Sequence, residues 1–112
     1  MKKVDAIVRV SKLEDVKAAL EHAGVTGLSV EQVRGFGRQQ GQTGHFRGST
    51  YALNLVPKIR IVTVVPDELV EPAVAAIIDT ARSGEVGDGK IFVSDIEQAV
   101  RVRTGESGDD AL

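Results

Sequence analysis

Residues 84–90 form a glycine-rich stretch that ends in Lys90 and suits the binding of an anion. Where side chains are missing, backbone N–H groups can approach a phosphate closely, and a lysine adds positive charge. The stretch departs from a Walker A loop, because Ile91 stands where that motif has Ser or Thr. It indicates either an anion-binding turn or a flexible connection between a helix and a strand.

Arg101 and Arg103 are a second candidate for holding phosphate. Side chains two residues apart in a strand point to the same face, so both guanidinium groups could grip one polyphosphate. The other interpretation is a charged strand edge that discourages pairing with other chains.

A third candidate segment contains Gly35, Gly37 and Arg38 and opens a long polar stretch. Residues 38–54 are punctuated by glycine and show little apolar periodicity, which predicts a long loop. A loop of this length in a small domain is usually functional or disordered. Phe46 and Tyr51 near its expected tip are better suited to contacting a partner protein than to a simple linker.

Composition and spacing exclude several other kinds of chemistry. His22 and His45 fall on different elements and the chain has no cysteine, so a zinc site is not expected. The 14 Lys and Arg residues nearly balance the 16 Asp and Glu residues, and no continuous basic strip suits direct binding of nucleic acid. No apolar run approaches the roughly 20 residues that span a bilayer. We expect a cytoplasmic protein that reaches a membrane only through a target protein.

The elements that must position these segments follow from apolar periodicity. Alternating apolar residues predict a strand over 4–10. Apolar spacings of three and four predict a helix that Ser11 caps and Gly24 ends. The same reasoning predicts an extended segment over 28–35, a strand over 58–65, a helix from 66–67 through 78, a strand at 91–93, a short strand at 99–103, and a loose tail over about 107–112.

This order of elements predicts an α+β fold of the ferredoxin-like βαββαβ type. In that sandwich two helices cover one face of an antiparallel sheet, and here a long loop at about 37–55 joins the second and third strands. The 112 residues suffice for one domain, which we expect to span 1–112. So short a chain leaves much of its surface exposed, which favours oligomerisation.

Four segments, taken in order and with their spacing, resemble the PII family of nitrogen-regulatory signal proteins. They are residues 35–39 (GFGRQ), 46–51 (FRGSTY), 87–93 (GDGKIFV) and 101–106 (RVRTGE). The resemblance implies a compact homotrimer that binds ATP or ADP in clefts between neighbouring subunits. It assigns to the nucleotide the residues Ile7, Ser29, Gly35, Gly37, Arg38, Val64, Gly87, Asp88, Gly89 and Lys90, with Arg101 and Arg103 from the next subunit.

The resemblance also implies 2-oxoglutarate as an effector. Gln39 would hold a Mg2+ ion together with the ATP phosphates, and 2-oxoglutarate would join that ion. Lys58 and Arg9 would take its carboxylates, with Gln40 and Gly41 beside them. A site whose positive charge comes partly from Mg-ATP makes effector binding conditional on that nucleotide.

In the family the long loop contacts target proteins, such as an ammonium transporter or a nitrogen-metabolism enzyme. Arg47 matches a target-contacting arginine, and Ser49 and Tyr51 match residues that are modified in some relatives. The loop departs from the usual pattern at Gln40, Gly44, Phe46 and Thr50. These departures motivate an alternative, a paralogue that senses only adenine nucleotides and regulates another transporter or enzyme.

An enzyme that hydrolyses or transfers nucleotide is a further alternative, suggested by the glycine turn, Lys90 and the arginine pair. No evident water-activating base accompanies them in the sequence. We therefore expect a regulatory binding protein and not an enzyme, with at most slow cleavage of ATP.

Overall fold

The computed structural model describes residues 1–37, 45–46, 49–50 and 55–112, with residues 45–46 and 49–50 described by their backbone alone. Most of the predicted loop at 37–55 lies outside the described residues. Within it, β3 (His45–Phe46) pairs with β4 (Ser49–Thr50) in antiparallel register.

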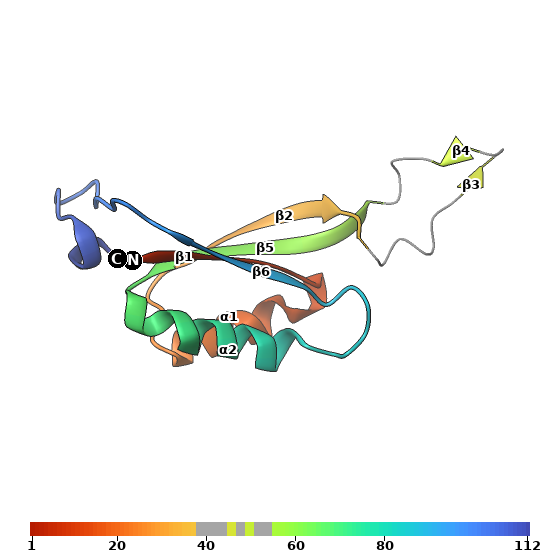
Figure 1. The fold of residues 1–112 in the computed structure, drawn as a ribbon, viewed down its shortest axis with the longest axis horizontal. Helices are drawn as coiled ribbons and strands as arrows, with labels where there is room; N and C mark the ends of the chain where they lie inside the picture. The colour runs from red at the N-terminus through yellow and green to blue at the C-terminus, as the bar shows by residue number, and fades with distance from the viewer. Residues whose placement is uncertain (38–44, 47–48, 51–54) are drawn as a thin grey trace.

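The described residues form a four-stranded antiparallel sheet with two helices on one face (Figure 1). The strands are β1 (Lys2–Val8), β2 (Ser29–Gly35), β5 (Val56–Val65) and β6 (Gly89–Asp95), in the spatial order β2-β5-β1-β6. The helices are α1 (Leu13–His22) and α2 (Val70–Ala81). This confirms the predicted α+β class and is consistent with a ferredoxin-like sandwich.

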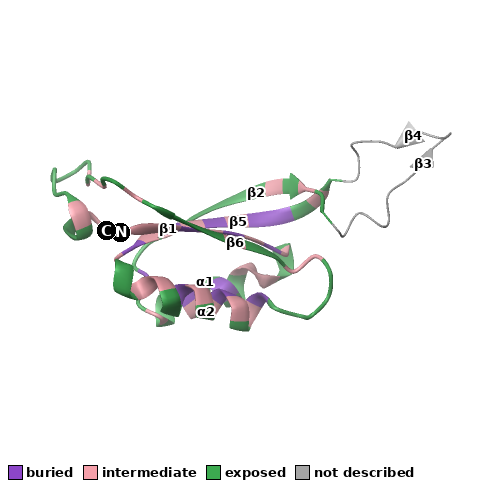
Figure 2. Ribbon diagram, in the orientation of Figure 1, coloured by how far each residue is buried: buried purple, intermediate pink, exposed green. Residues whose placement is uncertain are grey.

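The core lies between the sheet and the helices (Figure 2). From Val4 onward every second residue of β1 is buried, and β5 repeats the pattern through Ile59 and Ile61. Helix α1 contributes Val16 and Leu20, which are both fully buried. Removing a side chain the size of Leu20 from water stabilises the fold by about 1.5–3 kcal/mol. The buried residues that alternate along the strands and those spaced four apart in the helix thus pack together in one apolar layer.

Both helices begin with a short 3-10 turn instead of a side-chain cap. η1 (Val10–Lys12) precedes α1, and η4 (Asp67–Leu69) precedes α2. Ser11 therefore lies inside η1, and no side-chain hydrogen bond caps either η1 or α1. The predicted first strand was two residues too long at its end, because Val10 turns toward the helix.

The predicted short strand at 99–103 was wrong. Val100 forms an isolated bridge with Ser107, and the backbone between them turns. Arg101 closes this turn, because its N–H donates to the carbonyl of Glu106 at 2.8 Å and its own carbonyl accepts from Gly105 at 2.8 Å. Arg101 and Arg103 therefore do not share a strand face. The last residues, expected as a loose tail, form a 3-10 helix, η5 (Gly108–Ala111).

Candidate ligand-binding site

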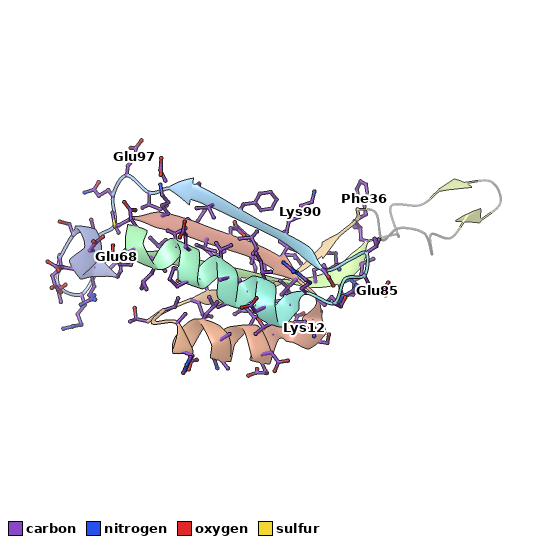
Figure 3. The ribbon with its side chains drawn as sticks, turned by 60° about the horizontal axis from the view of Figure 1, so that its bottom comes forward. Lys12, Phe36, Glu68, Glu85, Lys90 and Glu97 are labelled. Atoms are coloured by element: carbon purple, nitrogen blue, oxygen red, sulfur yellow. The ribbon has the colours of Figure 1, made fainter. Side chains whose placement is uncertain are left out.

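A cavity of about 450 Å³ lies at the end of the sheet where β2 ends and β5 begins. Figure 3 shows Phe36, Glu85 and Lys90 at this end, with Glu68 and Glu97 at the opposite end. The cavity is lined by Ile7, Gly35, Phe36, Gly37, Val56, Lys58, Glu85, Val86, Gly87, Asp88, Gly89, Lys90 and Phe92. These residues come from segments that are far apart in the chain and that the antiparallel sheet brings together.

Most of the predicted nucleotide residues that the structure describes line this one cavity. They are Ile7, Gly35, Gly37, Gly87, Asp88, Gly89 and Lys90, and Lys58 from the predicted effector site joins them. Ile7 and Lys90 are direct register partners in β1 and β6, so antiparallel pairing alone fixes their neighbourhood. The glycine-rich turn thus forms a wall of a cavity that Lys58 and Lys90 also line.

Asp88 organises the loop at 83–88 from within. One carboxylate oxygen accepts the backbone N–H groups of Ser83 at 2.8 Å and Gly84 at 2.9 Å. The other accepts the Ser83 hydroxyl at 2.5 Å. These donors hold the pKa of Asp88 well below its usual range, so the carboxylate stays charged at neutral pH. Its oxygens are thereby engaged by the loop itself.

Two cations hold the outer part of the same loop. Arg9 Nη2 donates to the Val86 carbonyl at 2.8 Å, and Arg9 Nε lies 3.4 Å from Asp88 Oδ1. Lys58 Nζ donates to the Gly87 carbonyl at 2.5 Å. Burial is the main cause of a lowered pKa at Lys58, and the neighbouring Arg9 lowers it further. Two successive carbonyls of the loop therefore each accept a hydrogen bond from a cationic side chain.

Gly89 joins the loop to β6 in a position that other residues cannot adopt without strain. Its φ is +108°, and a Cβ atom there would lie 1.7 Å from the carbonyl oxygen of Ile7. The absence of a side chain lets the loop approach β1 closely, which brings Lys90 opposite Ile7.

Some predicted site residues lie away from the cavity in this single chain. Ser29 is exposed at the start of β2, and Val64 lies near the far end of β5. Arg101 and Arg103 belong to the segment after β6, which lies at the end of the sheet opposite the junction of β2 and β5 (Figure 1). Arg101 donates to Glu106 at 3.1 Å and to the carbonyl of Leu112 at 3.3 Å. Their assignment to a neighbouring subunit stays a prediction.

The loop residues assigned by resemblance fall outside the described residues. They are Arg38, Gln39, Gln40, Gly41, Arg47 and Tyr51, and Ser49 is described by its backbone alone. The predicted Mg2+ ligand Gln39 is among them. In the described part of the chain, no three His, Asp or Glu residues gather in a way that could hold a metal ion. No helix among the described residues is long and apolar enough to cross a membrane.

Sequence reasoning missed several residues that line the cavity. They are Phe36, Val56, Glu85, Val86 and Phe92. Phe92 could have been predicted, because it follows Lys90 by two residues in one strand and so faces the same side of the sheet. Val86 was noted only as part of the glycine-rich stretch at 84–90. Val56 carried no such signal, since its place in the cavity depends on how the chain folds around it.

A sequence model of the family described as nitrogen regulatory protein P-II matches residues 1–106. The chain is 55% identical to the nitrogen regulatory protein P-II of Rhodobacter capsulatus and 53% identical to that of Cereibacter sphaeroides. It is 50% identical to nitrogen regulatory protein P-II 1 of Escherichia coli K12. Each comparison covers 112 residues and 100% of both chains. With the fold and the glycine-lined cavity in place, these matches show that the chain belongs to the nitrogen regulatory protein P-II family.

Proposed function

We propose that this protein is a cytoplasmic signal protein that binds ATP or ADP together with 2-oxoglutarate. It then controls a target, such as an ammonium transporter or a nitrogen-metabolism enzyme, through the loop at 37–55. The observation that carries the proposal is the cavity that joins the glycine-rich turn to Lys58 and Lys90. Its function is regulatory, as in the relatives named nitrogen regulatory protein.

The cavity has the two kinds of wall that a nucleotide needs. Ile7 and Phe92 provide apolar surface for a purine ring, and Lys90 with the glycine turn provides charge and backbone donors for phosphate. A volume of about 450 Å³ falls within the range of small-molecule sites. A homotrimer would complete the site by bringing Arg101 and Arg103 of a neighbour to the phosphates.

Lys58 supports 2-oxoglutarate as the second ligand. Its side chain is 9% exposed and its ammonium group is partly desolvated. A carboxylate placed beside such a group gains a strong charge-assisted hydrogen bond. Mg2+ held by ATP and Gln39 would supply the remaining positive charge for a dianion. In this arrangement the protein responds to 2-oxoglutarate, the signal of carbon supply, only when ATP is bound.

Calorimetric titration of 2-oxoglutarate into the purified protein tests the proposal. We expect binding in the presence of Mg-ATP and much weaker binding with Mg-ADP, which lacks the terminal phosphate. Nucleotide binding without 2-oxoglutarate binding would favour the paralogue that senses only adenine nucleotides. A protein that binds neither nucleotide would contradict the proposed function.

A further inference from the structure

The Glu106 carboxylate ties together the side chains of the C-terminal turn that contains Arg101. Its Oε1 atom accepts a hydrogen bond from Arg101 Nη1 at 3.1 Å and another from the Thr104 hydroxyl at 2.8 Å. The Thr104 hydroxyl also accepts the backbone N–H of Glu106 at 3.2 Å. Turning the carboxylate away from Arg101 would therefore break its contact with Thr104 as well.

The backbone of the turn holds Arg101 and Glu106 opposite each other. The N–H of Arg101 donates to the Glu106 carbonyl at 2.8 Å, and the Arg101 carbonyl accepts the N–H of Gly105 at 2.8 Å. The second terminal nitrogen of the guanidinium group, Nη2, donates to the Leu112 carbonyl at 3.3 Å, just after η5. Because a guanidinium group is planar, contacts at both terminal nitrogens restrict its orientation and leave its other donors for a ligand. The Arg101 side chain is 37% exposed, so a ligand can reach it.

Arg103, the other member of the predicted pair, is placed differently. It is exposed, and its guanidinium group has no partner among the described residues. A long side chain without a partner samples many rotamers, and ordering it when a ligand binds costs free energy. The turn therefore presents one arginine whose orientation is already restricted and one that a ligand must order.

We propose that Glu106 is a positioning residue that fixes the orientation of Arg101 for the nucleotide phosphates at the neighbouring subunit. A lone carboxylate near a polyphosphate would repel it, but the guanidinium group of Arg101 offsets the charge of Glu106 at 3.1 Å. The proposal rests on the proposed function, because it specifies how one contribution to the shared cleft is held ready. It gives Arg101 and Arg103 unequal parts in phosphate binding, although their spacing in the sequence suggested equal ones.

Replacing Glu106 separates positioning from simple repulsion by the sign of the effect. If Glu106 positions Arg101, Glu106→Ala weakens Mg-ATP binding about 2- to 10-fold, because Arg101 must then be ordered at the moment of binding. If Glu106 acts only through its negative charge, the same change strengthens Mg-ATP binding. Glu106→Gln keeps an oxygen that can accept from Arg101 and Thr104, so we expect a smaller loss. Asp110→Asn is the control, because this exposed carboxylate of the same segment has no partner in the described part of the chain. It should bind Mg-ATP as the wild type does.

Calorimetric titration of Mg-ATP into double variants provides the decisive comparison. Glu106→Ala should cause no further loss when Arg101 is already alanine, because both changes then act on one contact. The same change should keep its full effect in the Arg103→Ala background. If Glu106 only kept the turn folded, Glu106→Ala would displace both arginines and would weaken binding in the Arg101→Ala background too. That result, or an unchanged or strengthened affinity in Glu106→Ala alone, would overturn the inference.

NMR relaxation of the arginine Nε–H groups, measured without any ligand, separates failure of this inference from failure of the proposed function. We expect Arg101 to be more ordered than Arg103 in the wild type and in Asp110→Asn, and as mobile as Arg103 in Glu106→Ala. An Arg101 side chain that is equally mobile in the wild type and in Glu106→Ala would refute the positioning role, whether or not the protein binds nucleotide.

The expected order of Arg101 in a wild-type protein that binds no nucleotide would contradict the proposed function, while Glu106 would still position Arg101. Thermal unfolding confirms that each variant is folded, and Glu106→Gln replaces Glu106→Ala if the latter is not.

Discussion

Gly89 shows how much one residue contributes to the shape of the cavity. Sequence reasoning identified the glycine turn and Lys90, because the absence of side chains next to a lysine is itself a chemical signal. It did not identify what Asp88 does, and the resemblance assigned Arg9 to the effector. Arg9 and Asp88 become neighbours only after β1 has packed beside the loop, and no local pattern of residues encodes that approach.

Replacing Gly89 with alanine should destabilise the protein strongly. The positive φ costs a residue with a side chain about 1–2 kcal/mol. The clash with the Ile7 carbonyl adds about 1–3 kcal/mol, as overpacking does elsewhere. Gly84→Ala is the control, because Gly84 also has positive φ but a Cβ there would meet nothing within 4 Å. Urea unfolding should show the larger loss for Gly89→Ala, and equal losses would contradict the close approach to β1.

At the scale of elements, an ion cluster ties three strands together on the sheet face that the helices leave open. Arg60 of β5 donates to both carboxylate oxygens of Asp5 in β1, at 2.9 and 2.6 Å, and to Glu31 of β2 at 2.6 Å. Arg60 is opposite Glu31 in the register of β2 and β5. Pairing across three strands therefore helps to fix which residues are opposite one another.

The Asp5–Arg60 pair should make stability depend on pH in the acidic range. Hydrogen bonds from Arg60 lower the pKa of Asp5 below its usual value of 3.8. A lowered folded-state pKa means that the carboxylate contributes stability above about pH 4 and loses it as the pH falls through the folded-state pKa. Asp5→Asn should cost about 1–3 kcal/mol at pH 7, the scale of lost charge-assisted hydrogen bonds.

Urea unfolding from pH 7 to pH 2 checks this prediction. The difference between wild type and Asp5→Asn should shrink below about pH 4. Asp95→Asn is the control, because Asp95 also pairs with a cation, Lys2, but its side chain is 81% exposed. That variant should stay close to the wild type throughout. An Asp5→Asn loss that persists unchanged at pH 2 would show that the charge of Asp5 is not its cause.

Periodicity predicted the helices and the four strands of the sheet because apolar burial has a fixed period in each. The same rule misled at the C-terminus. Val100, Arg101, Val102 and Arg103 alternate as a strand would, but Val102 is fully exposed and the segment turns back toward Ser107. Alternation indicates a strand only where one face is buried, and here the described structure covers neither valine with a core.

At the scale of the whole molecule, the cavity lies at one end of the sheet, and the C-terminal segment that contains the arginine pair lies at the other end. A nucleotide held by both therefore requires a second subunit, as the predicted homotrimer provides. The sequence could suggest this only through the family resemblance, because one chain contains no signal for its neighbour's position.

Co-expression of two defective variants tests the shared cleft. Lys90→Ala damages the cavity and Arg103→Ala damages the contribution from the neighbour, so each variant alone should bind ATP weakly. With random mixing about three quarters of trimers contain both, each with one intact cleft, so about one quarter of subunits should bind at wild-type strength. Equilibrium dialysis with ATP measures the number of high-affinity sites per subunit and so tests this fraction. A mixture that binds no better than the separate variants would contradict a cleft formed between subunits.

The sheet order also determines when the protein can fold on the ribosome. β1 is synthesised first among the strands, yet its two partners are β5 and β6, and Lys2 pairs with Asp95. At cellular rates of synthesis, roughly 4 to 19 s separate the emergence of β1 from that of its last partner. Until β5 emerges, β1 has no strand to pair with, and the sheet is complete only when β6 arrives. Contacts so distant in sequence slow folding, and the nascent chain is a natural client for chaperones until β6 arrives.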